Sequence, residues 1–518
     1  MSTTTNATSS STTSSTSNAG GVERVHDLLG IGLGPFNLGL AALAEPLGLD
    51  CLFLERKDRF AWHPGMLLPS STLQVPFMAD LVTMADPTSR YSFLNHLKRE
   101  GRLYRFYIRE SFYPLRVEFD RYCRWVADQL PSVECGWDVR DVTWHPELDA
   151  TGQGRFTVES VDAGGRHRTD HARRLVLGTG TPPHVPAAFS DVADDAAVVH
   201  TADYLAAREL LQQHRSVTVV GSGQSAAEVY RDLLPEARTH GYRLDWVTRS
   251  PRFFPLEYTK LTLEMTSPEY ADYFHALPAG TRDDLLVSQA QLYKGIDGEL
   301  VDEIYDLLYE LDVDGPPPTR LFTGTACERV VREGGGYRLH LHHAEQDRRS
   351  SLTTDAVVMA TGYRQQVPGF CRGVAEHLRW DEHGRFDVTR DYRVDLAAGH
   401  QDDDEGGGSS APAPAGSVFV QNAEAHTHGF VAPDLGMAAY RNSCILRAVL
   451  GREPYPVERA IAFQHFGVPP TDPPLSGALL PGTPRARSSG DGGAPAGTTP
   501  RAGRPSRSRA GAAVGGRR

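Results

Sequence analysis

Two glycine-rich sequences constrain the fold of this chain more than any other feature. Residues 32–37 read Gly-Leu-Gly-Pro-Phe-Asn, and residues 221–226 read Gly-Ser-Gly-Gln-Ser-Ala. Each follows a short apolar run typical of a buried parallel strand and opens a segment with helical periodicity. Glycines let such a turn approach a pyrophosphate closely, and the following helix offers free N–H groups and a positive dipole end to its charge. The sequence therefore predicts two dinucleotide-binding units in one chain.

The first glycine loop favours a cofactor whose adenosine ribose lacks a 2′-phosphate. We expect a strand at residues 28–31, a helix at 38–44, and a second strand at 52–54 that ends at Glu55. An acid in this place accepts hydrogen bonds from ribose hydroxyls. FAD or NAD fits this half. The expected cofactor-binding residues are Gly32, Gly34, Pro35, Asn37 and Glu55.

The second glycine loop has a different ending, which favours NADP(H). We expect a strand at residues 217–220, a helix at 225–234 and a strand at 244–248, followed by Arg249 and Arg252. An arginine where the acid would stand can pair with a 2′-phosphate. For either loop alone, a tight strand-to-helix turn without a ligand is the alternative. The expected cofactor-binding residues are Gly221, Gly223, Gln224, Ser225 and Arg249.

Two further strand-to-glycine segments, residues 175–183 and 355–363, indicate where the chain crosses between the two units. The chain order is then FAD, NADP, FAD, with a returning strand at 418–422 and a closing helix at about 436–450. Cofactor-binding residues are also expected at the second crossing. They are Thr361, Gly362 and Tyr363.

The predicted fold class is α/β, with two Rossmann-like dinucleotide-binding domains, a smaller helical substrate region and disordered tails. Helical segments such as 299–311 are expected in the substrate region. Low-complexity ends and a Gly, Ser, Ala and Pro-rich stretch set the remaining boundaries. The expected divisions are a tail at 1–22, a first FAD-domain segment at 23–210, the NADPH domain with the substrate region at 211–350, a second FAD-domain segment at 351–470 with a loop insertion at 396–416, and a tail at 471–518.

Composition points to a large cytoplasmic enzyme. A chain of 518 residues exceeds one compact core, and its hydrophobic content of 40% and charged content of 23% are ordinary for globular proteins. No apolar run approaches the length that spans a bilayer, so we expect no stable membrane insertion. The six scattered cysteines form no C-x-x-C pair, which disfavours dithiol flavoenzymes such as thioredoxin reductases. The basic C-terminal tail is interpreted as a solvated extension, without nucleic-acid binding.

Several uncommon sequences together resemble one family over about residues 25–470. It is the family of flavin-dependent N-hydroxylating monooxygenases of siderophore biosynthesis, the lysine N6- and ornithine N5-hydroxylase family. The resemblance rests on the glycine loops at 32–37 and 221–226, Trp-His-Pro-Gly-Met at 62–66, Leu-Gln-Val-Pro-Phe at 73–77, Asp-Pro-Thr-Ser at 86–89, Phe-Leu-Asn at 93–95, Ala-Thr-Gly-Tyr at 360–363 and His-Thr-His-Gly at 426–429.

The resemblance implies an enzyme that uses FAD, NADPH, O₂ and a small-molecule amine. In the family, NADPH reduces FAD, and a C4a-hydroperoxyflavin passes its distal oxygen to a neutral amine. The amine must first lose its proton, since an unperturbed alkylammonium has a pKa near ~10.4. A homo-oligomer, dimer or tetramer, is also implied.

The resemblance also assigns roles near the flavin. It implies that Gln74 is the catalytic residue, close to flavin and nicotinamide, with a structural hydrogen-bonding role as its alternative. Trp62 and Met66 would line the flavin ring, with ordinary core packing as the alternative. His63, His428 and Leu435 complete the expected cofactor-binding set. No metal is expected, because a His-x-His pair at 426–428 lacks a third ligand in metal spacing.

One departure from the family predicts the substrate. Amino-acid hydroxylases of this family carry a lysine for the substrate carboxylate where this chain has Ala79, and asparagines where it has Leu263 and Leu292. A buried carboxylate without a cation costs several kcal/mol. The leading substrates are therefore the diamines cadaverine or putrescine, as in the cadaverine-hydroxylating branch of desferrioxamine-type pathways.

Alternatives remain at this point. Glu257, Glu264 or Asp297 could bind the second ammonium of a diamine. Conversely, a basic side chain could replace the missing lysine and restore L-lysine or L-ornithine as substrate; the candidates are Lys260, Lys294 and Arg90. A general flavin or Baeyer–Villiger monooxygenase and a non-catalytic redox sensor are the alternatives outside the family.

Overall fold

The structure is a computed structural model that describes residues 24–147, 151–397, 412–458 and 460–468. The chain divides into two units, Met1–Gly467 and Val468–Arg518, and only Val468 of the second unit is described. The two expected tails, and residues 398–411 of the expected loop insertion, lie outside the described residues. No helix in the described ranges has both the length and the apolar character needed to cross a membrane.

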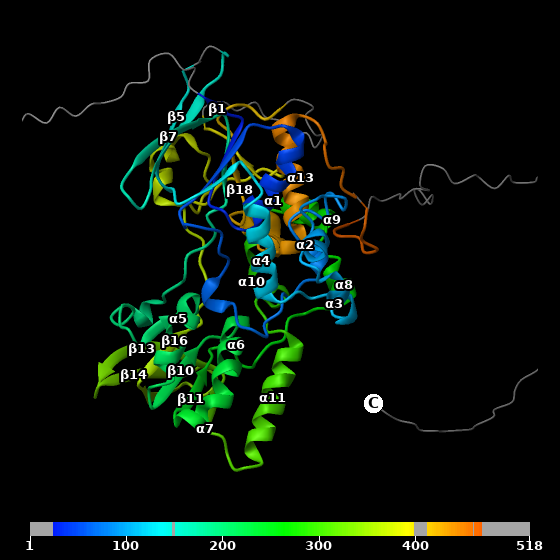
Figure 1. Ribbon diagram of the computed structural model, residues 1–518. Helices are drawn as coiled ribbons and strands as arrows, with labels where there is room; N and C mark the ends of the chain where they lie inside the picture. Colours follow the sequence, from blue (N-terminus) through cyan, green and yellow to red (C-terminus); the bar gives the residue numbers. More distant parts are fainter. Residues whose placement is uncertain (1–23, 148–150, 398–411, 459, 469–518) are drawn as a thin grey trace, which may run out of the picture. The chain divides into compact units, whose positions relative to one another are not determined.

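The first large sheet contains the first glycine loop and collects strands from three distant regions of the sequence (Figure 1). Four of its strand pairs are parallel, and only β17 runs antiparallel to its neighbour β18. The sheet confirms that the segments at 175–177 and 418–420 flank the first loop. Its order is β17 (Arg393–Val394), β18 (Val418–Val420), β8 (Leu175–Leu177), β2 (Leu28–Ile31), β3 (Cys51–Glu55) and β4 (Val133–Cys135).

Two helices from opposite ends of the chain pack together at this sheet. The glycine loop leads into α1 (Pro35–Ala44), and α13 (Ala438–Leu450) lies against it (Figure 1). All α1 residues except Phe36 are buried, so this helix is apolar on nearly every side, as expected for a helix enclosed between a sheet and a second helix. The closing helix predicted at 436–450 is thereby confirmed.

The second large sheet is entirely parallel and contains the second glycine loop. Two of its strands come from segments that were expected in the FAD domain: β9 lies before residue 211, and β16 lies after residue 350. The expected boundaries at 210 and 350 are therefore wrong, because both segments form their backbone hydrogen bonds in this sheet. The order is β12 (Thr319–Phe322), β11 (Arg243–Val247), β10 (Ser216–Val220), β16 (Ala356–Met359) and β9 (Val198–His200).

Helices from the same stretch of chain cover this sheet. α6 (Gln224–Leu233) follows the glycine loop, and α11 (Gly298–Asp312) packs against α6 (Figure 1). The leucines of α11 join the apolar core of the sheet, which also holds Val217, Val219 and Trp246. The expectation that residues 299–311 belong to the substrate region is therefore wrong: their apolar stripe is used to cover the second nucleotide unit.

Each of the two large sheets is accompanied by a smaller antiparallel sheet. In sequence, this smaller sheet comes directly before one strand of the large sheet. One insertion precedes β8 and the other precedes β16. Neither insertion was predicted from the sequence. The first consists of β5 (Asp138–His145), β6 (Arg155–Val161) and β7 (His167–Ala172), joined by β1 (Val25–His26), and the second of β13 (Thr325–Glu333), β14 (Gly336–His343) and β15 (Arg348–Thr354).

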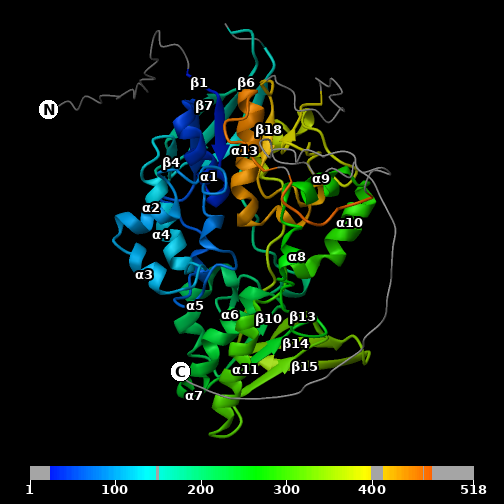
Figure 2. The ribbon, with the colours of Figure 1, turned by 90° about the vertical axis from the view of Figure 1, so that its right-hand side faces the viewer.

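A helical region lies in sequence between β11 and β12 of the second large sheet. It packs, however, on the segment that contains α12, near the C-terminal end of the described chain (Figure 2). Helices α9 (Pro268–Ala276) and α10 (Ala279–Ser288) contact α12 (Ala425–His428). Their shared core contains Tyr270, Phe274 and Phe430. A second helical group packs on the hydrophobic core that α1 and α13 share. It consists of α2 (Phe93–Arg99), α3 (Leu103–Ile108) and α4 (Arg116–Ala127).

Candidate functional site

The first glycine loop has the backbone geometry that a dinucleotide requires. Gly32 has φ +85°, and a Cβ there would lie 2.7 Å from the carbonyl oxygen of Gly178. A side chain at Gly34, by contrast, would meet no described atom within 4 Å. Among the residues that the structure describes, no side chain caps α1, which begins after Gly34. The N–H groups of its first turn are therefore left for a ligand.

Asn37, predicted to bind the cofactor, holds the loop instead. Its Nδ2 donates to the carbonyl oxygen of Gly32 at 2.7 Å, and its Oδ1 accepts from Nε2 of Gln421 at 2.8 Å. The side chain is 0% exposed. Both ends of the amide bind protein partners, so the side chain of Asn37 ties the loop to the segment after β18, and a contact between Asn37 and the cofactor stays a prediction.

Glu55 stands where the sequence predicts it, at the end of β3. Its Oε2 accepts from the backbone N–H of Leu33 at 2.7 Å, and its Oε1 accepts from the N–H of Lys57 at 3.0 Å. The carboxylate is thus aimed at the glycine loop. Each oxygen keeps a second lone pair with which it could accept from a ribose hydroxyl.

The second loop repeats this pattern. A Cβ at Gly221 would lie 2.2 Å from the carbonyl oxygen of Ala360, whereas one at Gly223 would meet only the carbonyl oxygen of Lys294 at 3.7 Å. No described side chain caps α6. The loop therefore leaves space in front of the α6 N-terminus, next to Ser225.

Gln224, also predicted to bind the cofactor, is engaged within the protein. Its Nε2 donates to Glu228 at 2.8 Å, and its Oε1 accepts from the backbone N–H of Asp297 at 2.8 Å. Glu228 in turn pairs with Arg116 of α4 at 2.7 Å. The side chain of Gln224 thus holds the start of α11 against the loop, and its predicted contact with the cofactor stays a prediction.

Arg249 lies beyond the end of β11, where the sequence predicts a residue that distinguishes the two kinds of ribose. It follows β11, is exposed, and forms no ion pair with any described residue. The Arg252 guanidinium lies 4.2 Å from the ring centre of Phe254. An unpaired guanidinium at this edge fits a 2′-phosphate, since planar guanidinium groups bind phosphate oxygens in pairs.

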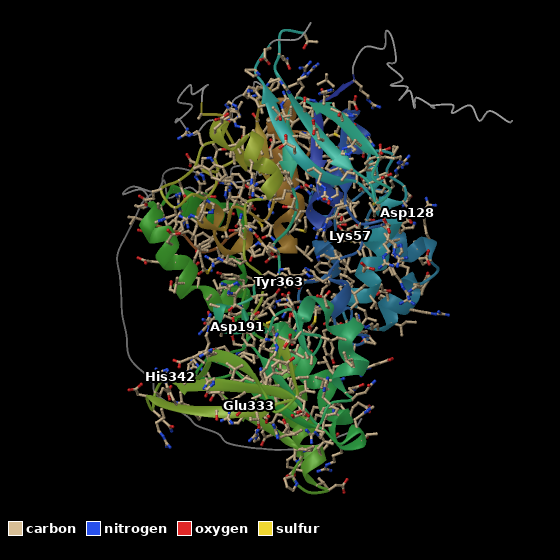
Figure 3. All side chains as sticks on the ribbon, turned by 90° about the vertical axis from the view of Figure 1, so that its left-hand side faces the viewer. Lys57, Asp128, Asp191, Glu333, His342 and Tyr363 are labelled. Atoms are coloured by element: carbon tan, nitrogen blue, oxygen red, sulfur yellow. The ribbon has the colours of Figure 1, made fainter. Side chains whose placement is uncertain are left out.

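The two chain crossings meet at a group of aromatic rings. The ring of Tyr363 lies 5.5 Å from that of His63 and 5.4 Å from that of His200. Gly362 has φ +75°, and Thr361 donates to the carbonyl oxygen of His184 at 2.5 Å. The structure thus brings His63 and Tyr363, which are far apart in sequence, into contact; Tyr363 is marked in Figure 3.

His63 has an unusual backbone and a shifted pKa. Its φ is +46°, which is uncommon for a residue with a side chain. The residue is exposed as a whole, but desolvation of the imidazole, and then the charges of Arg116 and Lys57, lower its pKa to about 4. His63 is therefore neutral at neutral pH. It can donate or accept a hydrogen bond without bringing positive charge to the site.

Trp62 and Met66 are both expected to line the flavin ring, but they lie in different hydrophobic cores. Trp62 packs on the core of the first large sheet and Met66 on that of the second. The Trp62 ring packs edge-on against Phe119, 5.3 Å away, and its backbone N–H donates to Asp120 at 3.0 Å. Met66 is 3% exposed and belongs to the core of the second sheet, together with Tyr204. The prediction that the Met66 side chain lines the flavin is therefore corrected, and core packing, the alternative, is what the structure shows.

Gln74 has an unusual feature for a partly buried amide. Its Nε2 is shielded from solvent yet finds no hydrogen-bond partner among the residues that the structure describes. Its backbone oxygen accepts from the Tyr258 hydroxyl at 2.5 Å. Since an unsatisfied buried donor costs about 1–3 kcal/mol, this amide fits a role in which a bound cofactor supplies the missing acceptor.

The expected substrate residues are only partly brought together. Ala79 is buried at the end of η3 (Phe77–Ala79), a short helix that contacts η11 (Leu435–Met437). Leu292 packs on the core of Tyr270 and Phe274, whereas Leu263 is 40% exposed. Ala79 and Leu435 therefore form one neighbourhood, and Leu263 is not enclosed with them.

The acids proposed for the second ammonium are otherwise engaged or exposed. Glu264 accepts from the backbone N–H groups of Phe463 and Gln464, each at 3.0 Å. Asp297 caps α11 by accepting from the N–H of Glu299 at 2.9 Å, and Glu257 is exposed.

Sequence reasoning missed Asp434, an acid directly before the predicted Leu435; its place in an otherwise apolar segment was the available signal.

The basic side chains that could restore an amino-acid substrate are also engaged or exposed. Arg90 pairs with Glu45 at 2.9 Å and donates to the Tyr91 hydroxyl at 2.6 Å. The Lys294 ammonium lies 5.0 Å from the ring centre of Tyr293, and Lys260 is exposed at the start of α8 (Lys260–Leu263).

His426 and His428 are core residues. His426 binds the carbonyl oxygen of Phe386 at 2.8 Å. His428 is 0% exposed, binds the carbonyl oxygen of Arg390 at 3.2 Å, and stacks on Tyr392 with ring centres 4.3 Å apart. Desolvation lowers the pKa of both histidines. The assignment of His428 to the cofactor is thereby corrected, because its ring nitrogens bind protein groups.

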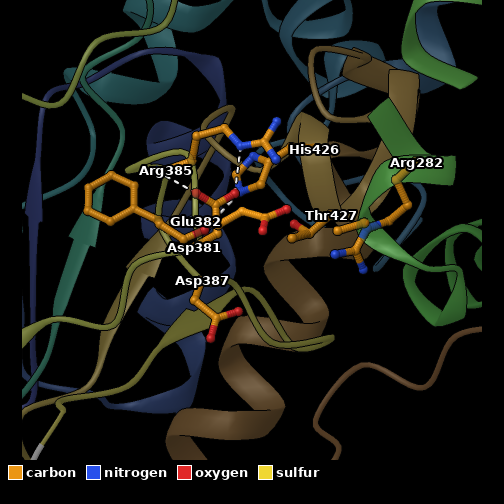
Figure 4. A pocket seen from close by; sticks show the side chains of 9 residues that line it. Arg282, Asp381, Glu382, Arg385, Asp387, His426 and Thr427 are labelled. Atoms are coloured by element: carbon orange, nitrogen blue, oxygen red, sulfur yellow. Dashed lines mark hydrogen bonds and ion pairs between the residues drawn. The ribbon is translucent and has the colours of Figure 1, made fainter. Parts of the chain in front are cut away.

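A pocket of about 330 Å³ opens beside His426 and Thr427 (Figure 4). Its walls carry an ion network in which Arg385 pairs with Asp381 at 2.6 Å and with Asp283 at 2.7 Å. The glycine loops, Gln74 and Ala79 do not line it. The arginine is already neutralised by two carboxylates, so the pocket has no unpaired charge from Arg385 for a ligand.

Comparison with known proteins gives consistent results. The model of the L-lysine 6-monooxygenase/L-ornithine 5-monooxygenase family matches residues 24–365. The putrescine N-hydroxylase of Shewanella oneidensis is 48% identical over 85% of this chain and 84% of its own. The FAD-bound cadaverine monooxygenase DfoA of the desferrioxamine pathway, from Erwinia amylovora, is 49% identical with a TM-score of 0.79 over 86% of this chain and 100% of its own.

An ornithine hydroxylase gives a more distant match. The Kutzneria sp. 744 ornithine N-hydroxylase, solved with reduced FAD, NADP⁺ and L-ornithine, is 29% identical with a TM-score of 0.73 over 82% of this chain and 98% of its own. The glycine loops and the crossings lie within the stretch matched by the family model. Because that model spans well over half of the chain, the protein belongs to the L-lysine 6-monooxygenase/L-ornithine 5-monooxygenase family.

Proposed function

We propose that this protein hydroxylates one primary amine of an aliphatic diamine, cadaverine or putrescine, with FAD, NADPH and O₂, and so begins the synthesis of a hydroxamate siderophore. The observation that carries the substrate class is the buried Ala79 at the end of η3, the short helix that contacts η11. A methyl group stands where the amino-acid hydroxylases place an ammonium for the substrate carboxylate. The similarity to a putrescine hydroxylase and a cadaverine monooxygenase supports this reading.

The first glycine loop would hold FAD. The N-terminus of α1 would bind the pyrophosphate through its free N–H groups, with Gly34 leaving the space for it, and Glu55 would accept from the ribose. The unpaired Nε2 of Gln74 would donate to the flavin or to the nicotinamide. When bound and reduced, FAD supplies the electrons that activate O₂ for transfer of one oxygen atom to the amine.

The second glycine loop would hold NADPH. The α6 N-terminus behind Gly223 would bind the pyrophosphate, and Arg249 would pair with the 2′-phosphate. The exposed, unpaired state of Arg249 fits this role. An NADP⁺ retained here would also shield the flavin from water, as the family resemblance implies.

The surrounding side chains favour a reactive, neutral amine. Ala79, Leu73 and the partly buried Leu435 add apolar surface, and burial without an anionic partner lowers the pKa of an amine. His63 is neutral at neutral pH and does not repel or protonate it. The protein residues thus position the amine and exclude water while the cofactor carries the oxygen.

The test compares four substrates at equal concentration: cadaverine, putrescine, L-lysine and L-ornithine. Hydroxylamine product is quantified by mass spectrometry alongside NADPH consumption with added FAD. We expect a diamine to be hydroxylated far better than either amino acid. Preferred hydroxylation of lysine or ornithine would overturn the diamine assignment, and another oxygenated product would point to a general flavin monooxygenase.

Binding of both nucleotides without turnover would instead indicate a redox sensor. The dimer or tetramer that the family resemblance implies and the cytoplasmic location expected from composition stay predictions. Light scattering of the purified holoenzyme tests the oligomeric state.

A further inference from the structure

Asp434 is a carboxylate without a cationic partner in a mostly enclosed position. It forms no ion pair with any residue in the described ranges, and its side chain is partly exposed. Its Oδ1 accepts from the backbone N–H of Gly436 at 2.7 Å. Desolvation raises the pKa of Asp434, although the Gly436 N–H and the charge of Arg441 act in the opposite direction. The charge of Arg441 thus acts on Asp434 without an ion pair between them, and a carboxylate that is desolvated in this way is stabilised when it binds a cation directly.

The position of Asp434 connects the two halves of the proposed site. It directly precedes η11, whose Leu435 lies in the neighbourhood of Ala79. It is also close enough to Tyr258 for its charge to help raise the pKa of that phenol, after the larger effect of desolvation. The Tyr258 hydroxyl donates to the backbone of Gln74. Asp434 therefore lies near Tyr258, whose hydroxyl binds the residue expected at the flavin, and it directly precedes the short helix that contacts η3, which ends at Ala79.

We propose that the Asp434 carboxylate binds the distal ammonium of the diamine, the amine that is not hydroxylated. This inference rests on the proposed function and adds a residue that determines its specificity. One oxygen is held by Gly436, and the other, Oδ2, accepts from the ammonium, which has three N–H donors. The substrate is thus fixed at one end while its other, neutral end faces the oxygen donor.

The same charge selects against amino acids. Lysine and ornithine differ from the diamines by an α-carboxylate near their distal amine. Ala79 offers that carboxylate no cation, and Asp434 would repel it. Discrimination through loss of an attraction together with a new repulsion is stronger than through either alone.

Other roles for Asp434 are separable from this one. As a cap of η11 it uses Oδ1 only, and asparagine caps equally well. Asp434→Asn therefore keeps the hydrogen bond to Gly436 and removes the charge. A matched control is Asp284→Asn, the same chemical change at an exposed aspartate of α10.

The experiment compares cadaverine with 1-aminopentane, which has the same length but no second ammonium. Dissociation constants are measured by calorimetry on the FAD-loaded enzyme with NADP⁺, and KM and kcat by hydroxylamine formation. For Asp434→Asn we expect the cadaverine Kd and KM to rise about 10- to 100-fold, the range for a lost charged hydrogen bond. Values for 1-aminopentane and the FAD content should stay close to those of the unchanged protein, and Asp284→Asn should match it for both amines.

Each other outcome has a definite meaning. Equal losses for both amines, or an unchanged cadaverine Kd, would overturn the inference while leaving diamine hydroxylation standing. A loss of cadaverine selectivity in Glu257→Gln rather than in Asp434→Asn would move the anchor to Glu257. If the unchanged protein hydroxylates lysine and neither diamine, the proposed function fails, and the inference fails with it. Asp434→Ser, which also caps, repeats the test if the asparagine variant does not fold.

Discussion

The two glycine loops share one local plan and differ at the residue that ends the neighbouring strand. In both, a Cβ on the leading glycine would clash with the carbonyl oxygen of the residue that follows another strand, at 2.7 Å for Gly178 after β8 and 2.2 Å for Ala360 after β16. In both, the following helix lacks a described side-chain cap. The first loop is faced by the buried Glu55, the second by the exposed Arg249. In the proposed function the shared features would bind a pyrophosphate, and the differing residue would select the ribose.

The loops are also held in different ways. Asn37 is fully buried and links the first loop to Gln421, more than 380 residues away in sequence. Gln224 is partly exposed and links the second loop to Asp297 and Glu228. The first loop is thus embedded in the protein core, whereas the second is held by amides nearer the surface. Loss of the side-chain hydrogen bonds of Asn37 and of Gln224 should therefore lower the thermal stability by different amounts.

The largest effect is expected from a methyl group at either leading glycine. Gly32→Ala imposes a positive φ on alanine and a clash with Gly178, and Gly221→Ala a clash with Ala360. Together such strain and overpacking cost about 2–5 kcal/mol. Gly32→Ala should abolish FAD retention, and Gly221→Ala should abolish NADPH-dependent flavin reduction; absorbance and stopped-flow measure these. Wild-type behaviour of both would refute the close approach seen here.

Arg249→Ala should change the choice between NADPH and NADH. Loss of the guanidinium removes a charged hydrogen-bond partner worth about 1.5–3 kcal/mol, so KM for NADPH should rise about 10- to 100-fold. KM for NADH, which lacks the phosphate, should change little. Steady-state flavin reduction with each nucleotide measures both values. A parallel rise for NADH would show that Arg249 acts on the fold rather than on the phosphate.

Removal of the Asn37 or Gln224 side chain should lower the thermal stability by different amounts in the two loops. Asn37→Ala leaves the Gly32 carbonyl and the Gln421 amide unpaired in the core, at a cost of about 1–3 kcal/mol. Gln224→Ala frees groups that water can reach and should cost less. Thermal midpoints of the two variants, compared with the wild type, decide this. A larger shift for Gln224→Ala would contradict the comparison.

The smallest effect is expected from a decrease in pH, which should lower the folding stability through His428. Desolvation lowers the pKa of His428, so it stays neutral in the fold, whereas the unfolded chain takes up a proton below its ordinary value of ~6.5. Stability is therefore complete above about pH 6.5 and falls as pH decreases, by up to about 1.4 kcal/mol per pH unit for each such histidine. Denaturation midpoints from pH 7.5 to 5 test this. His428→Gln should flatten the slope, and an unchanged slope would speak against His428.

Much of the nucleotide-binding framework could be predicted from sequence because its signals are local. The strand at 28–31 is confirmed residue for residue as β2, and the strands at 217–220 and 244–248 agree with β10 and β11 within a residue. α1 begins three residues earlier than expected, since proline is favoured in the first turn and opens the helix at Pro35. Glycine turns and apolar runs act over a few residues and need no tertiary context.

The roles of single side chains were harder to predict. Asn37, Met66 and His428 carry motif signals, yet each is engaged with, or packed among, groups from distant regions of the chain. Burial and hydrogen-bond partners decide whether a polar residue faces a ligand, and neither is encoded locally. Asp434 was missed for the same reason, because Tyr258, on which its charge acts, comes from another segment.

The sequence by itself determined two nucleotide loops, their different ribose-facing residues, the family and the missing lysine at Ala79, because glycine geometry, apolar periodicity and charge type are properties of short segments. Only the tertiary structure decided which sheet receives β9 and β16, that α11 covers the sheet of the second glycine loop, and that Asp434 lies near Tyr258 without an ion pair in the described ranges. These depend on long-range strand pairing and on desolvation, which arise when distant segments pack together.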